Sequence, residues 1–73
     1  MTTMSIHNVR ARNLRVGDLV QTDVYPQLFK IISANPFTRS VMVIKLGEIE
    51  SGDYATQFTA FNDEYIPVHI PVI

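Results

Sequence analysis

The stretch Arg12-Asn13-Leu14-Arg15-Val16-Gly17-Asp18-Leu19-Val20 decides the fold of this chain. Gly17 can take a positive φ without steric cost, and Asp18 can hydrogen-bond its own backbone across a turn. We expect both sides of that turn to be anchored in a core by Leu14, Val16 and Leu19 or Val20. The stretch therefore predicts a sharp turn into a buried strand at the entry to a small β-barrel.

Short runs of apolar, β-branched and aromatic residues follow at close intervals, as in sandwiches and barrels. The expected strands span residues 6–12, 19–24, 28–33, 40–46, 54–61 and 65–73. An Asn-Pro turn over 34–39, an acidic loop over 47–53 and a polar turn over 62–64 separate the later strands. Helical periodicity is missing, which limits helix to one turn near residues 12–15. The predicted fold is all-β: a small, SH3-like, partly open β-barrel of five to six short strands with at most one short helical turn.

Two strands have distinctive patterns. Residues 40–46 are apolar on both faces, which predicts a central strand. The last strand has the cleanest period of two, and its prolines, Pro67 and Pro71, fall on one face. Because proline has no N–H to donate, this pattern predicts an edge strand.

The size and composition favour one small domain that associates with a second copy of itself or with a partner. Residues 1–73 form a single domain, with residues 1–4 expected to be disordered. A chain this short buries only about 60% of its unfolded surface, and without cysteine it has neither disulfides nor a thiolate metal site. Such domains often gain stability by self-association, so a homo-oligomer is expected. No segment approaches the roughly 18 apolar residues of a membrane span, and no signal peptide is evident, which predicts a cytoplasmic protein.

The charge is divided along the chain. All six basic residues precede position 46, whereas five of the seven acidic residues follow it. This division is compatible with a basic binding face, with complementary faces that join subunits, or with a mixture once the strands interleave.

Both ends of the chain resemble one group of proteins. Val9-Arg10-Ala11-Arg12-Asn13-Leu14-Arg15-Val16-Gly17-Asp18 looks like the start of many short, uncharacterised β-rich proteins encoded by bacteriophages of actinobacteria. Phe61-Asn62-Asp63-Glu64-Tyr65-Ile66-Pro67-Val68 is similar to their ends. The resemblance covers under half of the chain. It implies a phage source, with the host cytoplasm as location, and a small barrel, but it transfers no function.

The sequence predicts no enzyme, no cofactor and no metal. Its serines stand beside no recognisable base, and its clustered carboxylates lie in solvated loops where nothing perturbs them. His7 and His69 lie in the first and last strands, which pairing would bring together, but no ligand spacing supports a zinc site.

Protein–protein binding is therefore the leading hypothesis, as a host-directed accessory factor or a minor assembly component. Exposed aromatic side chains suit interface anchors, namely Tyr25, Phe37 and Tyr65. The alternative is nucleic-acid binding, in which Tyr25 and Phe37 stack on bases and arginines contact phosphates: Arg10, Arg12, Arg15 and Arg39. The net negative charge counts against this alternative. A small metal-dependent enzyme is the third and least supported class.

Overall fold

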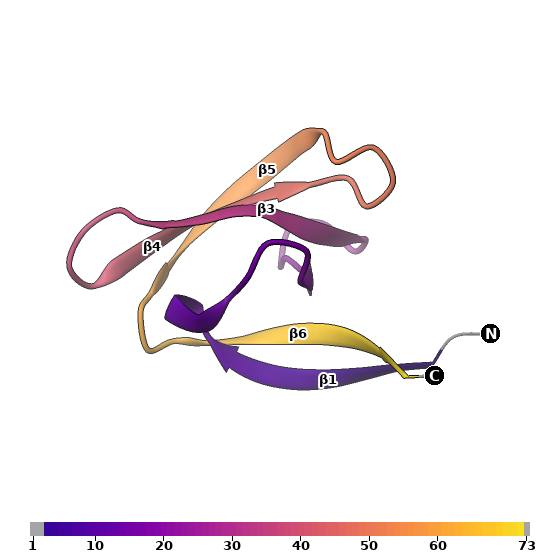
Figure 1. Cartoon of the computed structure of the whole chain (residues 1–73), viewed down its shortest axis with the longest axis horizontal. Helices are drawn as coiled ribbons and strands as arrows, with labels where there is room; N and C mark the ends of the chain where they lie inside the picture. The colour runs from indigo at the N-terminus through magenta and orange to yellow at the C-terminus, as the bar shows by residue number, and fades with distance from the viewer. Residues whose placement is uncertain (1–2, 73) are drawn as a thin grey trace.

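The computed structural model describes residues 3–72 as one open, six-stranded antiparallel sheet that curves around a small core (Figure 1). Its elements are β1 (Thr3–Arg10), the 3-10 turn η1 (Ala11–Asn13), β2 (Leu19–Gln21), β3 (Leu28–Pro36), β4 (Val41–Gly47), β5 (Tyr54–Phe61) and β6 (Tyr65–Val72). The spatial order is β1-β6-β2-β3-β4-β5, so β1 and β5 are the two edges. This confirms the predicted all-β, partly open fold with one short helical turn. Within the described residues, no helix has the length and apolar character needed to cross a membrane.

The opening turn forms as its sequence predicts. Gly17 has a φ of 98°, and the Asp18 carboxylate accepts a hydrogen bond from the Arg15 N–H at 2.9 Å. The Asp18 N–H donates to the Arg15 carbonyl at 3.1 Å, which closes the turn. Leu14 is buried, but the prediction for Val16 was wrong: this side chain is 69% exposed because it lies at the tip of the turn.

Two backbone hydrogen bonds fasten this turn to β3. The Gly17 N–H donates to the Ile31 carbonyl, and the Ile31 N–H donates to the Asp18 carbonyl, each at 2.8 Å. The chain therefore enters β2 already paired with β3, and Val20 becomes fully buried beside Ile31 in the core.

The core is small and wholly apolar among the described residues. Every strand and η1 contribute to it or pack against it: Ala11, Leu14, Val20, Phe29, Ile31, Met42, Ile44, Leu46, Ala60, Ile66 and Val68, with Val9, Ala34 and Phe58 partly buried at its margin. On β4, Met42, Ile44 and Leu46 point inward while Val41 and Val43 are half-buried. The prediction of an interior β4 is confirmed, since it pairs with both β3 and β5.

The prediction that the last strand is an edge was wrong. β6 lies between β1, with which it forms eight residue pairs, and β2, with which it forms two. The Ala11 N–H donates to the Glu64 carbonyl in continuation of the β1–β6 register, so even-numbered residues of β6 turn their backbone groups toward β1.

The prolines explain how β6 is accommodated inside the sheet. Pro67, His69 and Pro71 turn their backbone atoms away from β1, toward the β2 side, and only His69 of these three has an N–H. The ladder to β2 is confined to Val68 and His69, between the two prolines. The missing donors thus shorten the β2–β6 ladder rather than placing β6 at an edge.

Several strand boundaries differ from those expected. β2 ends at Gln21, short of residue 24, and β3 continues to Pro36, so the hairpin turn covers 37–40. Thr3 and Met4, expected to be disordered, belong to β1 because β6 is long enough to pair with them at Val72 and Pro71. Residues 1 and 2 lie outside the described residues.

Beyond the core, β1 and β6 continue as a two-stranded ribbon, here called the terminal arm (Thr3–Ser5 paired with residues 70–72; Figure 1). Ile66 and Val68 are buried, whereas Ile70 and Val72 on the same face of β6 are exposed. The arm accounts for the elongated shape, whose longest extent is 41 Å. Ile73, at the end of the apolar tail, lies outside the described residues.

Gly17→Ala tests the opening turn. A Cβ at this position meets no atom within 4 Å, so the cost is conformational and not steric. We expect the free energy of unfolding to fall by about 1–2 kcal/mol, because an L side chain is disfavoured at positive φ. Urea unfolding measures this loss, with the neighbouring exposed Val16→Ala as control. Equal stability of both variants contradicts the role given to Gly17.

Candidate functional site

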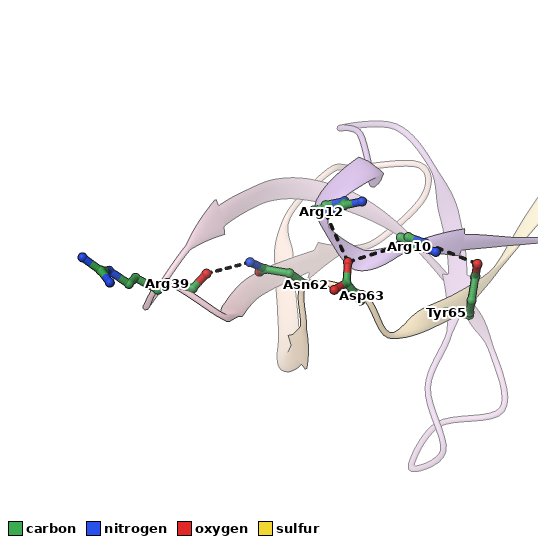
Figure 2. A network of polar contacts seen from close by, with 6 residues as sticks. All are labelled: Arg10, Arg12, Arg39, Asn62, Asp63 and Tyr65. Carbon is green, nitrogen blue, oxygen red and sulfur yellow. Dashed lines mark hydrogen bonds and ion pairs between the residues drawn. The ribbon is translucent and has the colours of Figure 1, made fainter.

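A polar cluster ties η1 to the turn between β5 and β6 (Figure 2). Asp63 Oδ1 lies 3.3 Å from Arg10 Nη1 and 3.2 Å from Arg12 Nη1, so one carboxylate pairs with two guanidinium groups. Both arginines come from the basic part of the chain and Asp63 from the acidic part. At this corner the two charge classes therefore interleave and do not form separate faces.

Arg10 also contacts an aromatic ring. Its guanidinium carbon lies 5.3 Å from the centroid of the Tyr65 ring, and its Nε donates to the Tyr65 hydroxyl at 3.3 Å. The hydrogen bond that Arg10 donates to Tyr65, then the electrostatic interaction with Tyr65 and the charge of Asp63, raise the pKa of Arg10 above its usual value. These contacts hold both side chains against the protein surface, where they act first as structural partners of each other.

Asn62 connects three segments of the chain at the same corner, through its side chain and its backbone. Its Nδ2 donates to the Arg39 carbonyl at 2.8 Å, and its N–H donates to the Ser40 carbonyl at 2.8 Å. Its own carbonyl accepts from the Arg12 N–H at 3.1 Å. Asn62 thus joins the β3–β4 hairpin, the β5–β6 turn and η1.

The structure does not bring all the predicted binding residues together. Arg10, Arg12 and Tyr65 meet at the corner, while the Arg39 side chain points away from it (Figure 2). Phe37 lies in the same hairpin turn as Arg39 and is 71% exposed. Arg15 is exposed in the opening turn.

Tyr25 lies elsewhere, at the meeting point of two surface hollows. Its ring packs edge-on against Phe29, with 5.8 Å between centroids and an interplanar angle of 81°. The larger hollow, of about 470 Å³, is lined by residues 21–25, 56–59 and 64–67. The smaller one, of about 400 Å³, is lined by residues 25, 27–29, 48–50 and 55. Tyr25 lines both hollows, and β5 contributes Ala55 to the smaller one and residues 56–59 to the larger one. The two hollows are therefore neighbours along β5, and the pair is here called the β5 groove.

Local hydrogen bonds hold the loop of residues 21–26, which lines the groove opposite β5. The Tyr25 N–H donates to Thr22 Oγ1 at 3.1 Å, and the Gln21 side chain donates to the Pro26 carbonyl. β2 ends at Gln21, and Tyr25 lies in the irregular loop before β3, where Pro26 has no N–H to offer a strand ladder.

The groove is acidic and partly apolar. Asp23 and Glu64 line the larger hollow, and Glu48 and Glu50 line the smaller one. Within the described part of the chain, no Lys or Arg is among the residues that line either hollow. The buried Ile66 and half-buried Phe58 provide an apolar lining in the larger hollow.

Unpaired backbone groups lie along the same groove. The Asn62 N–H donates to Ser40 across the continued β4–β5 register, so Phe58 and Ala60 turn their backbone toward β4. Gln57 and Thr59 alternate with them and turn their N–H and carbonyl groups to the free edge. Both of these residues line the larger hollow.

The sequence indicated only part of this groove. Tyr25 and Tyr65 were predicted as binding residues and do line it. The acidic residues were interpreted as solvated loops, and nothing in their spacing shows that the 48–53 loop and the loop after β2 lie along one strand edge. Edge position depends on strand order: the sequence wrongly placed the last strand at an edge and did not identify β5 as one.

The two histidines do not converge on one site. In the β1–β6 ladder His7 is opposite Val68 and His69 is opposite Ile6, so their side chains lie on opposite faces of the sheet. Ser5 Oγ lies within hydrogen-bonding distance of His7 Nε2, at 3.1 Å. Among residues 3–72, no three His, Cys, Asp or Glu side chains are grouped so as to hold a metal ion.

Comparison with known proteins adds no assignment: no protein-family model, no curated protein and no solved structure matches the chain.

A pair of isosteric exchanges tests which residue holds the corner. Asn62→Asp replaces the amide that donates to Arg39 with a carboxylate that cannot, so we expect a loss of about 1–3 kcal/mol in the free energy of unfolding. Asp63→Asn removes only exposed ion pairs and is expected to cost less than about 1 kcal/mol. Chemical denaturation at neutral pH measures both, and the reverse order would show that the ion pairs, not Asn62, hold the corner.

Proposed function

We propose that this chain is a non-enzymatic protein-binding module that takes an extended segment of a partner protein along the free edge of β5. The observation that carries the proposal is the coincidence of unpaired strand backbone with the β5 groove. The partner segment adds a seventh strand and covers the open side of the sheet, a recognised mode of peptide binding.

The backbone supplies the affinity in this arrangement. Gln57 and Thr59 offer two N–H donors and two carbonyl acceptors toward the groove. The β5 edge carries no proline, lysine or other charged residue, which are the usual devices that block strand addition. A partner in extended conformation satisfies these groups without any rearrangement of β4 or β5.

The side chains supply the selectivity. Alternate residues of an added strand point to the groove, where Phe58 and Ile66 favour an apolar side chain. The four carboxylates along the groove favour basic residues near it. We therefore infer a partner segment in which apolar and basic residues alternate.

The same charge argues against nucleic acid in this groove, because phosphate is repelled by carboxylates. Outside the groove, two of the four arginines that the nucleic-acid hypothesis requires, Arg10 and Arg12, are already paired with Asp63. A phage source and a role as host-directed factor or assembly component are proposals that depend on the resemblance of the chain ends alone.

Peptide binding tests the proposal. A fluorescein-labelled ten-residue peptide that alternates valine and lysine is titrated with the protein, and the anisotropy is followed. We expect saturable binding that added salt weakens, and no binding of the matched valine–glutamate peptide. Thr59→Pro removes an outward N–H and keeps the ladder to β4, so we expect at least about tenfold weaker binding.

The controls distinguish backbone pairing at the β5 edge from nonspecific binding of the peptide. Asn8→Pro introduces a proline in β1, away from the groove, and is expected to bind the peptide as the parent does. Equal binding of the lysine and glutamate peptides, or full binding by Thr59→Pro, overturns the proposal. Retention of a labelled single-stranded oligonucleotide at low salt, lost by about 200 mM salt, would support the nucleic-acid alternative instead.

A further inference from the structure

The other edge of the sheet, β1, lies in surroundings that differ from those of β5. It pairs only with β6 among the described residues and forms the lower margin of the molecule in Figure 1. Residues 3–10 line neither of the two hollows that make up the β5 groove. Along its free edge β1 presents a row of backbone groups beside the exposed apolar side chains of Met4 and Ile6.

The register identifies which backbone groups are free. Pro67 and Pro71 are opposite Asn8 and Met4, and a proline cannot take part in a pair that exchanges two hydrogen bonds. Odd-numbered residues of β1 therefore bond to β6, in agreement with the Ala11 N–H that donates to Glu64 at 2.9 Å. The N–H and carbonyl groups of Met4, Ile6 and Asn8 point outward.

Nothing in this edge blocks the approach of another strand. From Thr3 to Val9 it contains no proline, no lysine and no bulge. It also contains no Asp, Glu or Arg, so an antiparallel pair of two such strands brings no like charges together. The edge is thus complementary to itself.

The terminal arm and the adjoining Ile6 supply the apolar contribution. Met4 and Ile6 are exposed on one face, and Ile70 and Val72 on the other. A two-stranded ribbon is too thin to bury either face, and such ribbons are marginally stable when isolated. Extension to four strands gives Met4 and Ile6 new cross-strand neighbours and places β1 in the interior of a wider sheet.

We propose that β1 pairs antiparallel with β1 of a second copy of this chain, which joins the two sheets into one. The two-fold axis passes at Ile6, so that Ile6 is opposite its symmetry mate and Met4 is opposite Asn8 of the second copy. This register pairs all the outward groups of Met4, Ile6 and Asn8 and leaves Arg10 with Asp63. The surface is independent of the β5 groove.

The size of the contact sets the expected strength. One pair of edge strands buries less than the roughly 1,600 Å² of a standard interface. We therefore expect a reversible dimer whose population rises with protein concentration, and no larger assembly, because a two-fold contact uses the edge completely.

Sedimentation equilibrium tests the dimer. We expect the parent chain to shift from monomer to twice the monomer mass as its concentration rises. Asn8→Pro removes one outward N–H, and Ile6→Lys places two like charges across the axis, so both are expected to stay monomeric with unchanged circular dichroism. Val16→Lys, an equally exposed position in the opening turn, and Thr59→Pro are expected to dimerise as the parent does.

The register of the β1–β1 pair can be tested by a disulfide cross-link. Because the chain has no cysteine of its own, a single introduced cysteine reports only on its own position. Directly paired residues of two strands lie within the distance a disulfide spans, so mild oxidation of Ile6→Cys is expected to give a covalent dimer, whereas Val16→Cys is not. In sedimentation equilibrium, a parent chain that stays monomeric at every concentration, or that reaches masses beyond the dimer, overturns the proposal. Dimer formation by both Ile6→Lys and Asn8→Pro also overturns it. Failure of Ile6→Cys to cross-link overturns it as well. Loss of peptide binding alone, with the dimer intact, would count only against the function of the β5 groove.

Discussion

The two prolines of β6 impose the constraint on which the rest of this structure depends. Because Pro67 and Pro71 lack an N–H on the side that faces β2, the ribbon of β1 and β6 joins the remaining four strands through two residue pairs only. The sheet therefore divides into a meander, β2 to β5, and a terminal ribbon that extends beyond the core. Both unpaired edges, β1 and β5, follow from this arrangement.

Two polar turns compensate for the short ladder. The Gly17–Asp18 turn fastens the start of β2 to Ile31, and Asn62 joins three connections at one corner. Both act through directional hydrogen bonds to backbone groups, whereas the core of the described residues is wholly apolar and supplies only non-directional stabilisation. Arg10 and Arg12 converge on Asp63 at the surface of the Asn62 corner, where these exposed ion pairs add only a small stabilisation.

Local chemistry was readable from the sequence, and strand order was not. Gly17, Asp18 and the alternation in β4, β5 and β6 predicted a turn and strands that the structure contains, because these signals depend on neighbours in the chain. The edge assignment of β6 failed because the pattern shows that a proline cannot donate but not how long the neighbouring ladder is. The β5 groove was missed for a related reason: Glu48 and Asp23 are far apart in sequence and lie along one strand only after the meander folds.

Residue-resolved amide hydrogen exchange by NMR, in dilute protein without peptide, tests the central claim that both edges present alternating free backbone groups. Slow exchange is predicted for His7 and Val9 and for Phe58 and Ala60, whose amides bond to β6 and β4. Fast exchange is predicted for Asn8 and Thr59, which lie between them and point outward. Uniform protection along either strand, or the opposite alternation, would contradict both the open sheet and the binding edges derived from it.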